Sequence, residues 1–158
     1  MLRCLVLCFL CLAGGLGFAV KPGQMAPDFT LQTLEGKTIS LQHLKGQPVV
    51  LVFWASWCSI CNEEFPLINR VFQQRKLKRV YLISATDSEK KVRVFFKTHV
   101  YPGLVPLLTG HTPAVQVARK YQVSGQPTMV FINASGRIEK VHSGAISTEN
   151  LLQILKML

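Results

Sequence analysis

Two cysteines, Cys58 and Cys61, stand three positions apart and are the residues best suited to chemistry in this sequence. A disulfide between cysteines so close would close a very small loop, which adds little chain-entropy stabilisation. A zinc site would need a second pair of ligands, yet no cysteine follows Cys61. The spacing therefore favours reversible thiol–disulfide chemistry over a structural staple or a metal centre.

The histidines offer no second chemical centre. Four are spread along the chain without the spacing of metal ligands, at His43, His99, His111 and His142. We therefore expect no metal ion and no bound cofactor, with the redox-active Cys58–Cys61 pair as the working group.

The position of the cysteines assigns them different roles. They follow the apolar run Val49–Trp54, which is too short for a helix and typical of a central strand buried on both faces. A helical pattern then continues to about residue 77. Cys58 would lie at the helix N-terminus, where free N–H groups and a partial positive charge lower a thiol pKa and favour an attacking thiolate. Cys61, almost one turn later, would be more buried and would resolve the mixed disulfide.

The rest of the pattern predicts an α/β fold with a mixed central sheet flanked by helices. An irregular Pro/Gly-containing stretch is expected after residue 98. Alternation of strands and helices before a late hairpin predicts helices on both faces of the sheet. The expected elements are a hairpin (29–41), a strand (80–84), two helices (88–98 and 113–121), two strands (129–132 and 137–142) and a helix from about residue 148.

The N-terminus has the three-part plan of a secretory signal. Arg3 precedes an apolar run, and small residues follow, with Gly17 and Ala19 at the positions that a signal peptidase reads. The alternative is an uncleaved anchor, although the 16 apolar-rich residues 5–20 fall short of the roughly 20 that span a bilayer. We predict a signal peptide (or membrane anchor) at 1–19, an exported domain at 20–158, and membrane attachment only if the leader is kept.

The charge balance is strongly basic. Eighteen Lys and Arg against eight Asp and Glu give a formal net charge of +10. Such a surface could attract acidic partners, and it could equally be a solvated face without a partner. Nucleic-acid binding is disfavoured by the export signal and by the lack of an interleaved aromatic platform.

Several segments resemble a known family. Residues 54–61 (WASWCSIC) resemble the thioredoxin superfamily, and residues 62–66 continue in the CxxCxxExP manner of TlpA/ResA-type extracytoplasmic thiol–disulfide oxidoreductases, which are related to AhpC/TSA proteins. Residues 26–31 (APDFTL) and 121–132 (YQVSGQPTMVFI) extend the match. The resemblance implies a thioredoxin-like fold with an N-terminal β-hairpin, a helical insertion near 88–98, and protein-disulfide oxidoreductase activity.

The resemblance also implies roles for residues around the pair. Pro127 matches a family proline with a cis peptide bond beside the cysteines, and we assign Trp57, Gln126 and Pro127 to substrate binding. Glu64 lies three residues after Cys61, on roughly the same helix face, and matches an acidic residue that relays protons and tunes the thiols. The plain structural alternatives are a proline that starts a strand and a solvated helix glutamate.

The direction of electron flow stays open at this point. The resemblance implies a reductant of protein disulfides, with cytochrome c maturation as one setting and a membrane thiol donor as the partner that recharges it. Ser59 and Ile60 depart from the common form, which has proline before the second cysteine. The alternatives are a disulfide-forming oxidant on the same fold, a thiol peroxidase, whose usual Pro/Thr context around the cysteine is absent here, and a non-enzymatic binding or chaperone module.

Overall fold

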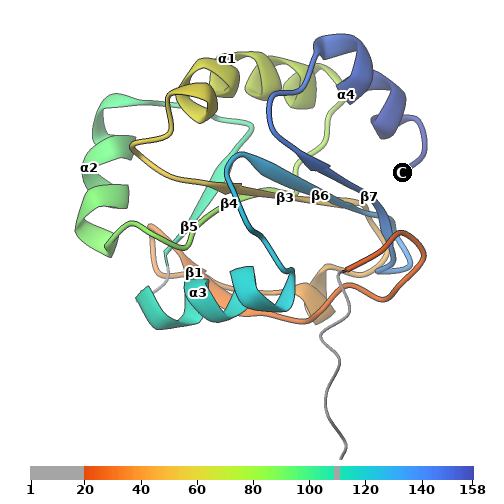
Figure 1. Ribbon diagram of the computed structural model, residues 1–158, viewed down its shortest axis with the longest axis horizontal. Helices are drawn as coiled ribbons and strands as arrows, with labels where there is room; N and C mark the ends of the chain where they lie inside the picture. Colours follow the sequence, from red (N-terminus) through yellow and green to blue (C-terminus); the bar gives the residue numbers. More distant parts are fainter. Residues whose placement is uncertain (1–19, 109–110) are drawn as a thin grey trace, which may run out of the picture.

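A seven-stranded mixed sheet runs through the described residues, 20–108 and 111–158, of this computed structural model (Figure 1). Its strand order is β2-β1-β5-β4-β3-β6-β7. The predicted signal peptide, residues 1–19, lies outside the described part. The strands are β1 (Thr30–Thr33), β2 (Thr38–Ser40), β3 (Val49–Trp54), β4 (Val80–Ser84), β5 (Val105–Leu108), β6 (Thr128–Ile132) and β7 (Ile138–Ser143). The helices are the 3-10 turn η1 (Leu41–Leu44), α1 (Ser59–Gln74), α2 (Glu89–Thr98), α3 (His111–Lys120) and α4 (Thr148–Leu155).

Strand β3 is the centre of the sheet and is buried along its whole length. It pairs in parallel with β4 and antiparallel with β6. Because successive side chains of a strand point to opposite faces, Val50 and Val52 enter one core and Leu51 and Phe53 enter the other. The continuous apolar run in the sequence is therefore explained by two cores, one on each face.

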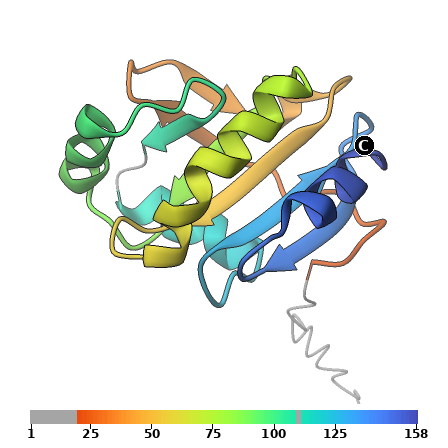
Figure 2. The same ribbon diagram turned by 90° about the horizontal axis from the view of Figure 1, so that it is seen from above.

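Helices cover both faces of the sheet, as the sequence predicts. Among the described helices, α1, α2 and α4 contribute to one core, with Phe65, Phe95 and Leu151 as members, whereas α3 packs on the opposite face. Figure 2 shows α1 and α4 side by side over the sheet, with α2 beyond the N-terminal end of α1. No helix in the described ranges combines the length and apolar character needed to cross a membrane.

The segment after residue 98 corrects one prediction. It was expected to be irregular, but it contains β5, which lies between β1 and β4 in the sheet. Pro106 stands opposite Leu82 and precedes the two residues that pair with β1, so its missing N–H breaks no bond to β1. The insertion around α2 therefore brings a strand as well as a helix.

The predicted N-terminal hairpin is confirmed by the antiparallel pairing of β1 and β2.

Candidate active site

The cysteine pair lies where the central strand turns into α1. Ala55, Ser56 and Trp57 follow β3, and Cys58 is the N-cap residue of the 16-residue helix. Cys58 and Cys61 form a disulfide, with 5.3 Å between their Cα atoms. The structure is therefore the oxidised form of the pair, at the end of a strand held on both sides by neighbouring strands.

The two sulfur-bearing side chains differ in their access to solvent. Cys58 retains 7% exposure, Cys61 has none, and the neighbouring Trp57 is 65% exposed. The backbone N–H of Cys61 donates to Sγ of Cys58 over 3.2 Å. An N–H donor and the positive end of a helix both stabilise an anionic sulfur. The geometry thus leaves Cys58 slightly exposed, with an N–H donor at its sulfur, and buries Cys61 completely.

Gln126 and Pro127 lie at the same end of the sheet as the cysteines. The Gln126–Pro127 peptide bond is cis, as the resemblance implies. Thr128 begins β6 opposite Phe53 of β3, so the preceding proline lies level with the end of β3. Trp57 and Gln126 also line one groove, together with Arg119 of α3. The structure therefore brings together the three residues assigned to substrate binding.

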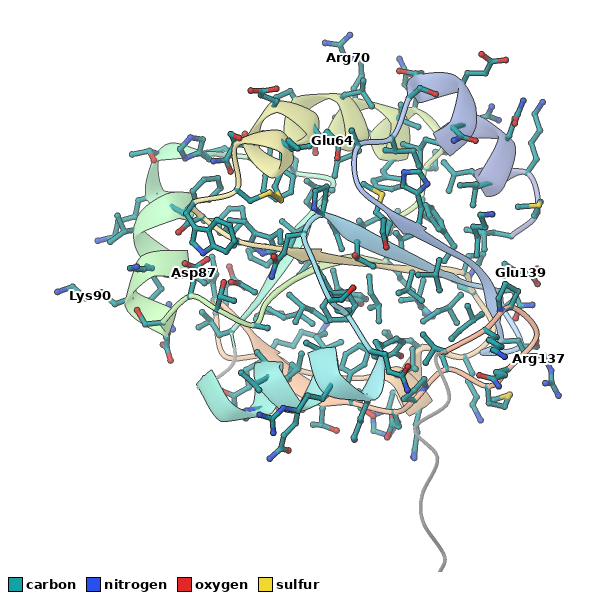
Figure 3. The ribbon with its side chains drawn as sticks, in the orientation of Figure 1. Glu64, Arg70, Asp87, Lys90, Arg137 and Glu139 are labelled. Atoms are coloured by element: carbon teal, nitrogen blue, oxygen red, sulfur yellow. A yellow bond between two sulfur atoms is a disulfide. The ribbon has the colours of Figure 1, made fainter. Side chains whose placement is uncertain are left out.

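Glu64 points from α1 towards the loop that leads into α4 (Figure 3). Its Oε1 accepts a hydrogen bond from the backbone N–H of Ile146, and Oε2 is buried without a hydrogen-bond partner among the described residues. Burial raises the pKa of this carboxyl above its ordinary value, while the Ile146 N–H and the charge of His142 oppose the rise. Glu64 is thus a half-buried acid, bonded to the α4 loop rather than to either cysteine, and not a solvated helix residue.

A buried carboxylate that the sequence analysis missed holds the loop in front of Cys58. Asp87 is 2% exposed. It accepts from the backbone N–H of Ser56 over 2.7 Å, from the Ser56 hydroxyl over 2.8 Å and from the Ser84 hydroxyl over 2.8 Å. Figure 3 shows Asp87 turned towards the interior at the start of α2. The sequence could have pointed to Asp87 through its place just after β4. The carboxyl ends of the parallel strands β3 and β4 meet at one edge of the sheet, so Asp87 lies close to the loop that follows β3.

The described ranges contain no evident metal centre. No three His, Cys, Asp or Glu residues there gather as ligands for an ion. The site as described holds the Cys58–Cys61 disulfide and, on the same helix, the half-buried Glu64.

The sheet, its helices and the CxxC pair at the start of α1 define a thioredoxin-fold protein-disulfide oxidoreductase. Residues 22–141 match the model of the AhpC/TSA family, and the chain belongs to that family. The predicted fold and the predicted relationship are both confirmed.

Named relatives agree with this class. The chain is 35% identical over 136 residues to the thiol-disulfide oxidoreductase ResA of Bacillus subtilis, covering 85% of this chain and 73% of ResA. The crystal structure of a thio-disulfide isomerase from Thermus thermophilus is 34% identical with a TM-score of 0.74, covering 87% of this chain and 96% of that one. The exposed lipoprotein thioredoxin Etrx1 of Streptococcus pneumoniae is 32% identical with a TM-score of 0.71, covering 84% of this chain and all of its own.

Proposed function

We propose that this protein reduces disulfide bonds of other proteins outside the cytoplasm, with Cys58 as nucleophile and Cys61 as resolving cysteine. The observation that carries the assignment of the two cysteine roles is the asymmetry of the pair. Cys58 is reachable at 7% exposure beside the exposed Trp57, and the fully buried Cys61 aims its backbone N–H at Sγ of Cys58. A substrate sulfur can therefore approach Cys58 first.

In the first step the Cys58 thiolate attacks one sulfur of the substrate disulfide. A new S–S bond joins Cys58 to the substrate, and the second substrate sulfur leaves as a thiolate that takes up a proton. The start of α1 favours the thiolate before attack. We assign the substrate segment to the groove that Trp57 and Gln126 line, with Pro127 directly after Gln126.

In the second step Cys61 loses its proton and attacks Sγ of Cys58. The mixed disulfide breaks, the substrate leaves as a dithiol, and Cys58–Cys61 becomes the disulfide seen in the structure. Two electrons have then passed from the protein to the substrate. We assign the acceptance of the Cys61 proton to Glu64, whose raised pKa suits a group that exchanges protons nearer to neutral pH than an ordinary carboxylate.

The setting of the reaction is part of the proposal. Support for export comes from the signal-like N-terminus and from the similarity to a protein described as an exposed lipoprotein. Recharging the oxidised pair requires a dithiol donor, and a membrane thiol donor fits an exported domain. The resemblance to TlpA/ResA-type proteins supports cytochrome c maturation as the setting.

The reduction potential of the Cys58–Cys61 pair tests the direction of electron flow. It can be measured from Trp57 fluorescence in glutathione and dithiothreitol redox buffers. We expect a value at or below about −230 mV, in the range of thioredoxin, at which the dithiol gives up electrons readily. A value near about −120 mV would instead assign the protein to the disulfide-forming oxidants.

The substitution Glu64→Gln tests the proton-transfer role. Because burial raises the pKa of Glu64, the rate of mixed-disulfide resolution should rise with pH as this carboxyl ionises. In the variant that rise should disappear, and resolution should slow by about a hundredfold, the lower end of general acid–base effects. Stopped-flow mixing of the reduced protein with a disulfide substrate at several pH values measures both quantities.

The neighbouring Glu63 supplies the matched control. It is exposed on the same turn of α1, so Glu63→Gln changes the charge without touching the half-buried acid. This control should keep the wild-type pH profile. An unchanged profile in Glu64→Gln would remove Glu64 from the mechanism.

A further inference from the structure

A second groove runs along α2, on the side of the active-site loop that carries Ser56. Its wall is formed by Ser56 and by residues of α2, including Lys90, Lys91, Val94 and Phe95. It is distinct from the groove that Trp57 shares with Gln126 and α3. We call it the α2 groove.

The α2 groove combines an apolar floor with a cationic rim. Val94 is 55% exposed, and Phe95, which belongs to the core, also lines the groove. His99 stacks on the ring of Phe95 with 4.1 Å between the ring centroids. The groove therefore offers an exposed aliphatic side chain and part of an aromatic ring to a ligand.

The rim carries positive charge that is not neutralised locally. Lys90 and Lys91 are both exposed, and neither forms an ion pair with a described residue. Figure 3 shows Lys90 extending from α2 into solvent. None of the described residues that line the groove is acidic. Glu89, at the start of α2, is paired with Arg93 instead.

The groove is within reach of the reacting sulfur. Ser56 lies two residues before Cys58, so their Cα atoms are at most about 7 Å apart. A substrate segment with its cysteine at Cys58 would place residues only a few positions away over Ser56 and α2. An interaction there would act on the same encounter that brings the two sulfurs together.

We propose that the α2 groove binds a segment of the substrate protein that carries acidic residues and a large apolar side chain close to the target cysteine. The inference rests on the proposed disulfide exchange and adds its substrate class. Charge complementarity selects this occupant, because two unpaired lysines border an apolar floor and the whole chain carries a formal charge of +10. The lysines attract the acidic residues, and Val94 receives the apolar side chain.

Two synthetic peptides with one disulfide each test the proposal. One carries Asp, Glu and Leu beside a cysteine, and the other has Ser at those three positions. The reduced full-length protein should react with the acidic peptide about tenfold faster at low salt. The difference should vanish between about 0.01 M and about 1 M salt, because the Debye length falls from about 30 Å to about 3 Å. Equal rates at low salt would overturn the proposal.

Charge reversal locates the effect. The double substitution Lys90→Glu/Lys91→Glu should abolish the preference for the acidic peptide. The matched control, Lys76→Glu/Lys78→Glu, reverses two exposed lysines beyond the far end of α1, about 24 Å along a helix of that length, and should keep the preference. Equal loss in both double variants would indicate general charge and overturn the groove assignment.

Further readouts separate the groove from the redox chemistry and from other occupants. All these proteins should reduce the small uncharged hydroxyethyl disulfide at the same rate, and failure of the wild type to do so would refute the proposed function rather than the groove.

Val94→Ser should slow reaction with the acidic peptide only while its Leu is present. Salt-sensitive dimers that Lys90→Glu/Lys91→Glu dissociates would assign the groove to a second copy of the chain and overturn the proposal.

Discussion

Replacement of Cys58 by serine is expected to abolish reduction of protein disulfides, whereas Cys61→Ser should halt the reaction one step later. Without the Cys58 thiolate no mixed disulfide can form, because the remaining sulfur of Cys61 is fully buried. With Cys61 replaced, Cys58 still attacks, but no internal thiol releases the substrate. Turnover assays in the presence of a dithiol, and mass spectrometry of the trapped species, measure the two outcomes.

The stability of the two variants provides the control. Because neither variant can form the Cys58–Cys61 disulfide, both should unfold at denaturant concentrations close to that of the reduced wild type. Residual disulfide reduction by a folded Cys58→Ser protein would contradict the assigned roles. A mixed disulfide that formed through Cys61 in that variant would reverse them.

Sequence patterns predicted those features that depend on neighbouring residues. The run Val49–Trp54 predicted a buried central strand because each of its residues enters one of two cores. The hairpin before it was predicted from two short strands around a turn, where Gly36 adopts a φ of 83° that glycine tolerates best. The cysteine spacing predicted that both sulfurs lie at the start of one helix, for the same local reason.

Features that depend on distant partners were missed. Strand β5 contains Pro106, which disfavours a strand when read locally, and it becomes a strand because β1 and β4 lie on either side of it. The bond between Ser56 and Asp87 joins residues 31 positions apart. Ser56 belongs to the recognised segment 54–61, whereas Asp87 lies outside it. The meeting of the two residues follows only once the parallel order of β3 and β4 is known.

The substitution Asp87→Ala is expected to lower the free energy of unfolding by about 3 kcal/mol, the range for leaving buried hydrogen-bond donors unpaired. It should also slow disulfide exchange by about tenfold where the protein is still folded, since each 1.4 kcal/mol of lost positioning is tenfold in rate. The carboxylate accepts from the backbone N–H of Ser56, two residues before Cys58, and so fixes the entry into α1. Urea unfolding and single-turnover kinetics measure the two effects.

Two serines separate the positioning of the loop from general stability. Ser84→Ala removes a bond to Asp87 at the end of β4 and leaves the Ser56 loop attached, so it should cost stability and spare the exchange rate. Ser56→Ala removes a hydroxyl but keeps the backbone N–H bond to Asp87, so its rate should also stay near wild type. In Asp87→Ala alone the loop is released, so this variant should lose exchange rate as well as stability. If the exchange rate of Asp87→Ala matched that of Ser84→Ala, Asp87 would support the fold without positioning Cys58.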